Sequence, residues 1–220
     1  GPQKSNILGD SRRVIDTAII LMEIGCPKEA ADLLQLESQN DAMLYYHLAW
    51  ARSKAGMDCQ EALERASQGN LDYTFPNSLE DMMALQFALK NNPRDGAAAY
   101  CLANLLYDKK RYDEAAQLWM SSVKNMPSFA TPLRNLAIYA FNKQKDAPKA
   151  LAMMERAFLL NRNDARVLME LDQLRKRSGV APADRLRRLK EYPNLVFGRD
   201  DLLCEFITLL NLSGLYNQAL

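Results

Sequence analysis

The side chains that could carry chemistry in this chain are few and scattered. His47 is the single histidine, and the four cysteines, Cys26, Cys59, Cys101 and Cys204, form no C-x-x-C pair. A zinc site needs histidine or thiolate ligands at short, regular spacing, so these residues predict no metal site and no cofactor. The scattered thiols instead indicate reduced cysteines of a cytoplasmic protein.

Two pairs of neighbouring carboxylates, Glu80-Asp81 and Asp200-Asp201, are the candidate general acids and bases. Both pairs stand where a helix is expected to begin, and the helix dipole favours negative charge there. Asp81 also follows Ser78 by three residues, the spacing of a capping box. The sequence carries no nucleophile-elbow, phosphate-loop, dinucleotide-binding or metalloprotease motif. We therefore predict no catalytic residue and no enzymatic activity within this segment.

The composition excludes several other classes of protein. The chain has 220 residues, of which 48% are hydrophobic and 25% charged, as in ordinary folded proteins and unlike disordered ones. No run approaches the roughly 18 to 20 apolar residues that a membrane helix needs, and no signal-peptide layout opens the chain. The formal net charge of +1 creates no field that would favour nucleic acid or anionic lipid. We expect neither as a partner.

Basic side chains nevertheless gather between residues 162 and 190, which raises the alternative of a surface for RNA or an acidic peptide. No aromatic residue interleaves with these charges before Tyr192, and long basic stems can simply cover apolar helix surface. A solvated face is therefore favoured over a nucleic-acid surface. The cluster consists of Arg162, Arg166, Arg175, Lys176, Arg177, Arg185, Arg187, Arg188 and Lys190.

The dominant feature of the sequence is an internal repeat of 34 or 35 residues. Leu102 precedes Leu136 by 34 residues, and Ala115 precedes Ala150 by 35. Within each repeat the apolar residues recur at three- and four-residue spacing, as an amphipathic helix requires. A short polar turn such as residues 108–112 joins two such helices, which must then lie antiparallel. The sequence predicts an all-α fold, a right-handed α-solenoid of antiparallel helical hairpins.

The repeat also predicts the organisation of the chain. We expect hairpins at 10–37, 41–68, 96–126, 130–160 and 164–191, and a single helix at 78–91. Residues 1–4 are expected to be a tag remnant and linker, 5–68 N-terminal hairpins, 69–77 an irregular elbow, and 78–220 a C-terminal array truncated in its last hairpin. Residues 69–77 are open to a second interpretation, as a functional loop. Because the last hairpin stops inside its second helix, we expect a longer parent protein that continues beyond Leu220 and begins before Ser5.

These units resemble the tetratricopeptide repeat (TPR). The unit that matches its consensus most fully does so at Leu102, Ala103, Tyr112, Ala115, Trp119, Ser122 and Pro127. The resemblance implies a scaffold without enzymatic activity, whose concave groove is lined by the first helix of each hairpin and binds a protein or peptide. In register, the residues aimed at this groove are Tyr46, Trp50, Tyr100, Asn104, Tyr107, Arg134, Ile138, Asn142, Arg166, Gln173 and Arg177. For each aromatic member, packing between hairpins is the alternative.

Some TPR proteins hold a peptide carboxylate with a lysine, two asparagines and further basic side chains. Asn104, Asn135 and Arg166 fall where that pattern places three of them. Tyr100 stands in place of the lysine, and Glu170 stands in place of an arginine. Because Glu170 would repel a carboxylate, capture of a peptide C-terminus is not expected from the pattern alone.

A narrower resemblance runs from DYTFPNSLEDMMAL, at residues 72–85, to the end of the chain. This succession is similar to a family of large bacterial proteins in which a sugar-enzyme-like region of unknown function precedes a TPR array. The resemblance implies a carbohydrate-related parent. Two functions stay open: a scaffold that binds a peptide or a neighbouring domain of the same parent, and an accessory or oligomerisation arm of that parent enzyme.

Overall fold

The structure, a computed structural model, describes residues 10–37, 40–72 and 74–219. These residues form helices joined by short turns, with one isolated β-bridge between Asp41 and Asn70. The described part of the chain is therefore all-α, as the repeat predicts. It divides into two compact units, unit 1 (Gly1–Pro127) and unit 2 (Ser128–Leu220). No described helix is long and apolar enough to cross a membrane.

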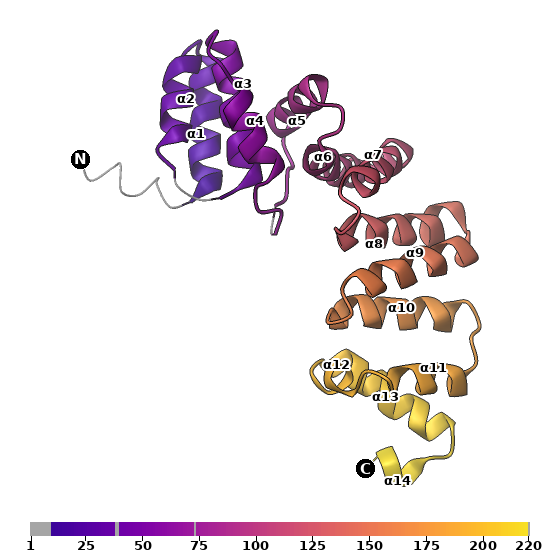
Figure 1. Cartoon of the computed structure of the whole chain (residues 1–220). Helices are drawn as coiled ribbons and strands as arrows, with labels where there is room; N and C mark the ends of the chain where they lie inside the picture. The colour runs from indigo at the N-terminus through magenta and orange to yellow at the C-terminus, as the bar shows by residue number, and fades with distance from the viewer. Residues whose placement is uncertain (1–9, 38–39, 73, 220) are drawn as a thin grey trace. The chain divides into compact units, whose positions relative to one another are not determined.

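Unit 1 is built from three helical hairpins and one single helix (Figure 1). The hairpins pair α1 with α2, α3 with α4, and α6 with α7, while α5 packs between α3 and α6. The helices are α1 (Ser11–Glu23), α2 (Pro27–Gln35), α3 (Ala42–Lys54), α4 (Gln60–Ser67), α5 (Leu79–Asn91), α6 (Gly96–Asp108) and α7 (Tyr112–Asn125). Each falls inside a range that the repeat predicts for a helix.

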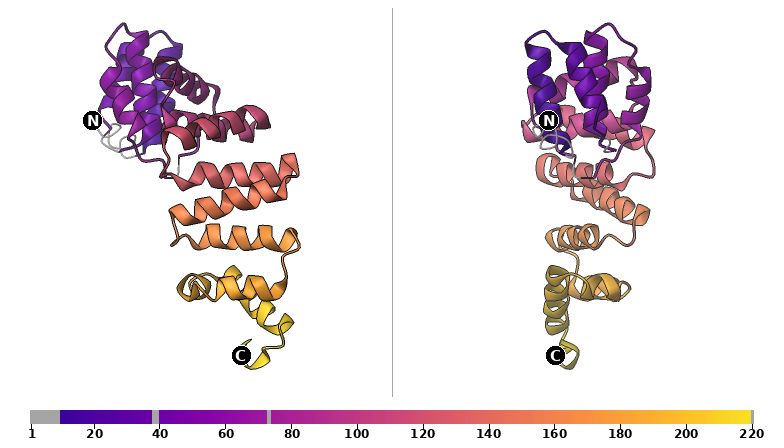
Figure 2. Two further views of the ribbon diagram at one scale, coloured as in Figure 1. Left: turned by 45° about the vertical axis from the view of Figure 1, so that its right-hand side comes forward. Right: turned by 90° about the vertical axis from the view of Figure 1, so that its left-hand side faces the viewer.

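Unit 2 continues the hairpin pattern, and α8, α9 and α10 lie side by side in both views of Figure 2. Two features were not expected from the sequence: a short helix, α12, and the packing of α11 mainly against α13. The elements are α8 (Ala130–Tyr139), the π-helical turn η2 (Ala140–Gln144), α9 (Ala147–Leu160), α10 (Ala165–Arg177), α11 (Pro182–Leu189), α12 (Pro193–Phe197), α13 (Asp200–Leu212) and α14 (Tyr216–Ala219).

Small residues at equivalent repeat positions bring the helices of a hairpin close together. Ala103 and Ala115 in the α6–α7 hairpin, and Ala137 and Ala150 in the α8–α9 hairpin, are fully buried. With a methyl group as the only side chain, the two backbones can approach closely, and large neighbours such as Trp119 fill the remaining space. The repeated alanines are therefore buried where the two helices of a hairpin meet, as the sequence predicts.

The turns inside the hairpins share one backbone conformation. Each contains a residue with positive φ, namely Gly25, Gly56, Lys110, Lys145, Gly179 and Gly214. Glycine adopts this left-handed conformation without a steric cost, which explains four of the six positions. Lys110 and Lys145 are 35 residues apart, whereas the buried Ala103 and Ala137 before them are 34 apart. The one-residue insertion therefore falls between Ala137 and Lys145, where η2 absorbs it as a widened turn.

Residues 69–77 lie inside unit 1 and are tied to the start of α3. The Asn70 backbone N–H donates to the Asn40 carbonyl at 3.0 Å. A Cβ added at Gly69 would stand 2.8 Å from the Cα of Ala42, so only glycine permits this approach. The second interpretation, that residues 69–77 are a functional loop, stays a prediction.

Asp81 is the polar centre of unit 1. Its side chain is fully buried and accepts hydrogen bonds from His47 Nε2 at 2.8 Å and from the Arg12 guanidinium at 2.9 Å. The backbone N–H groups of Asn77 and Ser78 also donate to it, and the capping box at the start of α5 is complete. Burial alone would raise the pKa of Asp81, but the hydrogen bonds from His47 and Asn77 hold it well below its usual range. One carboxylate thus joins α1, α3 and α5.

Arg185 of α11 plays the corresponding part in unit 2. Its guanidinium is 3% exposed and pairs with Asp172 of α10 and Glu205 of α13, which are 1% and 12% exposed. Arg175, which is also buried, pairs with Glu155 at 2.9 Å. The basic cluster at 162–190 is therefore not one solvated face, as the sequence suggests, because two of its members are core residues matched by carboxylates.

Replacing Asp81 with asparagine should destabilise unit 1 by about 3 kcal/mol, because Arg12 and His47 lose their shared anion. The low pKa of the folded carboxyl means that its contribution is complete above the unfolded value of about 4 and is lost as the pH falls further. Thermal denaturation followed by tryptophan fluorescence tests this, since Trp50 and Trp119 both lie in unit 1.

The matched control is Asp32→Asn on α2, where the side chain is exposed. The wild-type protein and the control should lose stability in parallel below about pH 4, where unfolded aspartate titrates, and Asp81→Asn should show a flatter profile. Equal pH profiles for all three proteins would contradict a structural role for the Asp81 charge.

Arg185→Ala should destabilise unit 2 by about 3 kcal/mol, because the enclosed Asp172 loses its partner and Glu205 keeps only its ion pair with Lys176. Arg187→Ala on the same helix removes an ion pair whose side chains are 71% and 56% exposed, and should cost less than about 1 kcal/mol. Circular dichroism during denaturation measures both. Equal losses of stability in the two variants would contradict the role assigned to the buried Arg185.

Candidate functional site

The candidate groove residues of unit 1 are mostly part of its packing. Tyr46 is fully buried, and its hydroxyl donates to Asp95, which caps α6, at 3.0 Å. Burial and the Asp95 charge raise the pKa of Tyr46. Tyr100 is 8% exposed. Contrary to the groove expectation, Tyr46 offers no surface to a partner and Tyr100 offers very little, because both side chains turn into the interior of unit 1.

The other candidates of unit 1 are half-buried and engaged within their own hairpins. Trp50 lies edge-on to His47, with ring centroids 6.2 Å apart. Tyr107 packs against Trp119 at 5.1 Å, and the Trp119 indole N–H donates to the Asn104 side-chain oxygen at 3.0 Å. These contacts lie within one helix or one hairpin, and the alternative of packing between hairpins stays a prediction. Their part in binding stays a prediction.

The residues with candidate acid–base chemistry lie apart, with His47 and Asp81 in unit 1 and Asp201 in unit 2. His47 and Asp81 are both fully enclosed in unit 1. Asp201 pairs with Arg199 at 2.6 Å at the start of α13. Within the described ranges, no three histidine, cysteine, aspartate or glutamate side chains come together as metal ligands would.

Unit 2 has a hollow of about 430 Å³, which we call the α10 hollow. It is formed by α8, η2, α9 and α10 together with the start of α13. Five of the six groove candidates in unit 2 line it, and Arg134 lies beside it through its ion pair with Glu170. The lining residues are Ile138, Phe141, Asn142, Met154, Arg166, Met169, Glu170, Gln173, Leu174, Arg177, Arg199 and Asp201.

Arginines surround the two carboxylates of the α10 hollow. Glu170 forms an ion pair with Arg134 and a second with Arg166 at 3.2 Å. Arg177 lies over the ring of Phe141, with its guanidinium carbon 5.7 Å from the centroid. The expectation that Glu170 would repel a carboxylate ligand needs correction, because two arginines already neutralise it. Asn135, another candidate for a carboxylate clamp, accepts a hydrogen bond from Arg134 at 3.0 Å.

Several lining residues were not expected from the sequence. Phe141 follows Tyr107 by 34 residues, so the repeat register could have identified it. Met169 precedes Gln173 by four residues and shares its face of α10. Arg199 could not be found in this way, because it belongs to the start of α13 and reaches the hollow only through packing.

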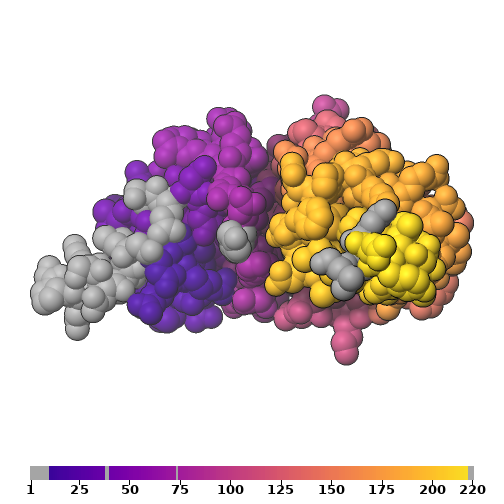
Figure 3. All heavy atoms as spheres, turned by 90° about the horizontal axis from the view of Figure 1, so that it is seen from below, coloured from indigo at the N-terminus to yellow at the C-terminus, as the bar shows by residue number. Residues whose placement is uncertain are grey.

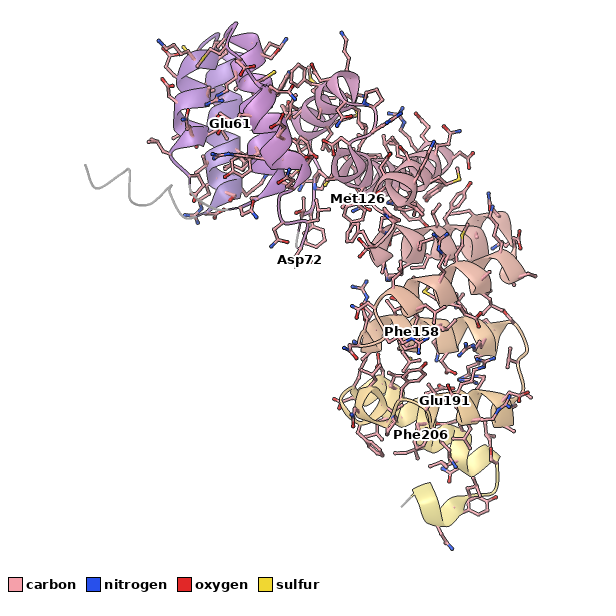
Figure 4. All side chains as sticks on the ribbon, viewed as in Figure 1. Glu61, Asp72, Met126, Phe158, Glu191 and Phe206 are labelled. Carbon is pink, nitrogen blue, oxygen red and sulfur yellow. The ribbon has the colours of Figure 1, made fainter. Side chains whose placement is uncertain are left out.

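A second, smaller hollow of about 190 Å³ lies on another side of unit 2, between α9, α10 and the end of α11. Phe158 of α9, labelled in Figure 4, packs edge-on against Tyr192 with ring centroids 5.0 Å apart. Its lining includes the Arg175–Glu155 ion pair, which belongs to the packing of unit 2. No groove candidate from the sequence lines it.

Comparison with known proteins identifies the fold. No family model matches the chain. The structure of PilF from Pseudomonas aeruginosa is similar over 95% of this chain and 86% of that one, with a TM-score of 0.54 and 17% sequence identity. A double mutant of MamA RS-1 matches over 88% of this chain and 98% of that one, with a TM-score of 0.50 and 17% identity. Both are TPR-like helical solenoids, and the likeness at this identity concerns the fold: this chain folds as a TPR-like α-solenoid.

Proposed function

We propose that this chain is a protein-interaction scaffold and that the α10 hollow is where it holds a peptide or a segment of a neighbouring domain. The fold supports the general part of this proposal, because stacked helical hairpins offer extended binding surfaces. The observation that carries the specific part is the lining of the hollow. Five residues aimed at a groove by the repeat register come together around one concave surface.

The position of the α10 hollow within the repeats supports this proposal. Its walls come largely from α8, α10 and the start of α13, which are the first helices of three hairpins of unit 2. In a solenoid these helices line the concave side. The hollow is thus built from equivalent positions of successive repeats.

The chemistry of the lining suits an extended peptide. Ile138 and Met169 are partly exposed and supply apolar surface, and methionine adapts its shape to different side chains. The amides of Asn142 and Gln173 each offer donors and an acceptor, which a peptide backbone needs. A few buried anchor residues of the partner would then provide most of the binding energy.

A peptide selection tests the proposal. Random linear peptides displayed on phage are selected on the wild-type protein, on Ile138→Trp, which fills the hollow, and on Leu160→Trp, which changes a residue 40% exposed and outside the hollow. We expect peptides that bind the wild type and the Leu160 variant equally and the Ile138 variant about tenfold more weakly. Circular dichroism confirms that both variants fold. Selected peptides that bind all three proteins equally, or no selected peptide, would contradict the proposal.

A second proposed function is the accessory or oligomerisation arm of a carbohydrate-related parent, which rests on the narrower sequence resemblance. One structural observation favours an association surface: Phe197, Leu212 and Tyr216, near the C-terminal end of unit 2, are 64% to 67% exposed. Figure 3 shows the C-terminal helices covering the visible end of unit 2. These three residues lie within 20 positions of one another in the sequence, and exposed apolar surface of this kind supports contact with another protein.

Sedimentation velocity at rising concentration tests this second function. The wild type should self-associate and Leu212→Lys should not, because a buried charge in the contact is costly. Leu159→Lys, which changes an apolar residue 57% exposed on α9, is the control. A wild-type protein that remains monomeric throughout would contradict the oligomerisation arm.

A further inference from the structure

We infer that the occupant of the α10 hollow is an acidic peptide, in which an aspartate or glutamate stands next to an apolar residue and pairs with Arg177. This inference rests on the proposed function and names the chemistry of the partner. It goes beyond a general peptide groove because it assigns one side chain of the hollow to one feature of the ligand.

The α10 hollow holds more arginines than carboxylates. Its lining contains the arginines Arg166, Arg177 and Arg199 and the carboxylates Glu170 and Asp201. Asp201 is paired with Arg199, and Glu170 with Arg166 and also with Arg134 from beside the hollow. Both carboxylates are therefore matched within unit 2. Among the described residues, no carboxylate forms an ion pair with Arg177, and with Arg134 included four arginines face two carboxylates, so the hollow has an excess of positive charge.

The guanidinium of Arg177 is positioned by its contact with Phe141. Its guanidinium lies over Phe141, with the guanidinium carbon 5.7 Å from the ring centroid, and this cation–π contact restrains the side chain. The N–H donors of a guanidinium lie in its own plane, where they can reach a carboxylate through two parallel hydrogen bonds. Arg177 is exposed, so these donors remain accessible. The group is held in position before a ligand arrives, which lowers the entropy cost of binding.

The η2 turn gives independent support. The insertion between Ala137 and Lys145 is absorbed at residues 140–144, and two residues of that turn, Phe141 and Asn142, line the hollow. Single π-helical turns inside α-helices occur frequently at functional sites. Here the ring beside Arg177 and the neighbouring amide both belong to this turn.

The surroundings of Arg177 select the kind of acidic ligand. Ile138, Met169 and Leu174 contribute apolar surface to the same hollow, so an apolar residue next to the acidic one would be buried against them. Nucleic acid suits the hollow less well. Phe141 is the one aromatic residue in the described lining and already contacts Arg177, so the hollow offers no series of rings on which successive bases could stack. The charges and the apolar surface together favour a peptide.

The test extends the phage selection to Arg177→Glu and to a matched control, Arg156→Glu, which reverses an exposed arginine of α9 outside the hollow. The wild type and the control should enrich peptides with aspartate or glutamate beside an apolar residue, and Arg177→Glu should not. The best acidic peptide, made synthetically and labelled with fluorescein, should bind Arg177→Glu at least about tenfold more weakly than the wild type. Changing its acidic residue to the amide should weaken wild-type binding equally, with little further effect on Arg177→Glu.

The outcomes separate the inference from the proposed function. Peptides that need the hollow, as judged by Ile138→Trp, but carry no enriched acid would overturn the inference and leave the proposed function standing. An equal loss on Arg156→Glu would overturn it as general charge attraction. Displacement of the peptide by a tighter-binding uridine oligonucleotide would overturn it in favour of nucleic acid. If no selected peptide needs the hollow, the proposed function fails and the inference fails with it.

Discussion

The close approach of two antiparallel helices within each hairpin is the constraint on which the rest of this structure depends. Ala103 with Ala115, and Ala137 with Ala150, stand fully buried at that approach. A larger side chain at these positions would push the helices apart, and a packed interior tolerates little added volume. Every repeat is built on such a pair of helices. The alanines set the distance between the two helices, and this distance in turn sets how far apart their exposed surfaces lie.

Buried charge adds specificity to this apolar framework. Asp81 joins three helices of unit 1, and Arg185 joins three helices of unit 2. Replacing such groups by apolar residues can be neutral for stability in other proteins, whereas removing one partner is costly. Their value here lies in fixing which helices meet. Arg185 is two residues from the exposed Arg187, so similar sequence positions have different roles.

The one-residue insertion in the α8–α9 hairpin connects the framework to the proposed site. A repeat that kept the 34-residue period would leave no extra residue between Ala137 and the turn at Lys145. The chain accommodates the extra residue as the π-helical turn η2 and keeps the buried alanines in register. Phe141 and Asn142, which belong to this turn, line the α10 hollow, and the ring of Phe141 lies against Arg177. The turn where the repeat departs from its period is therefore also part of the candidate binding surface.

The sequence by itself determined most of the helices, the pairing within most hairpins and the alanine positions, because these depend on local spacing and on a repeated pattern. It also identified five of the residues that line the α10 hollow, since residues at equivalent repeat positions share a face. The same register placed Tyr46 on a surface, although the tertiary structure buries it against Asp95. Burial depends on which neighbouring helix covers a face, and neither α5 nor α12 follows the repeat. Only the tertiary structure could decide which arginines are core residues, because their partners Asp172, Glu205 and Glu155 lie 13 to 20 residues away.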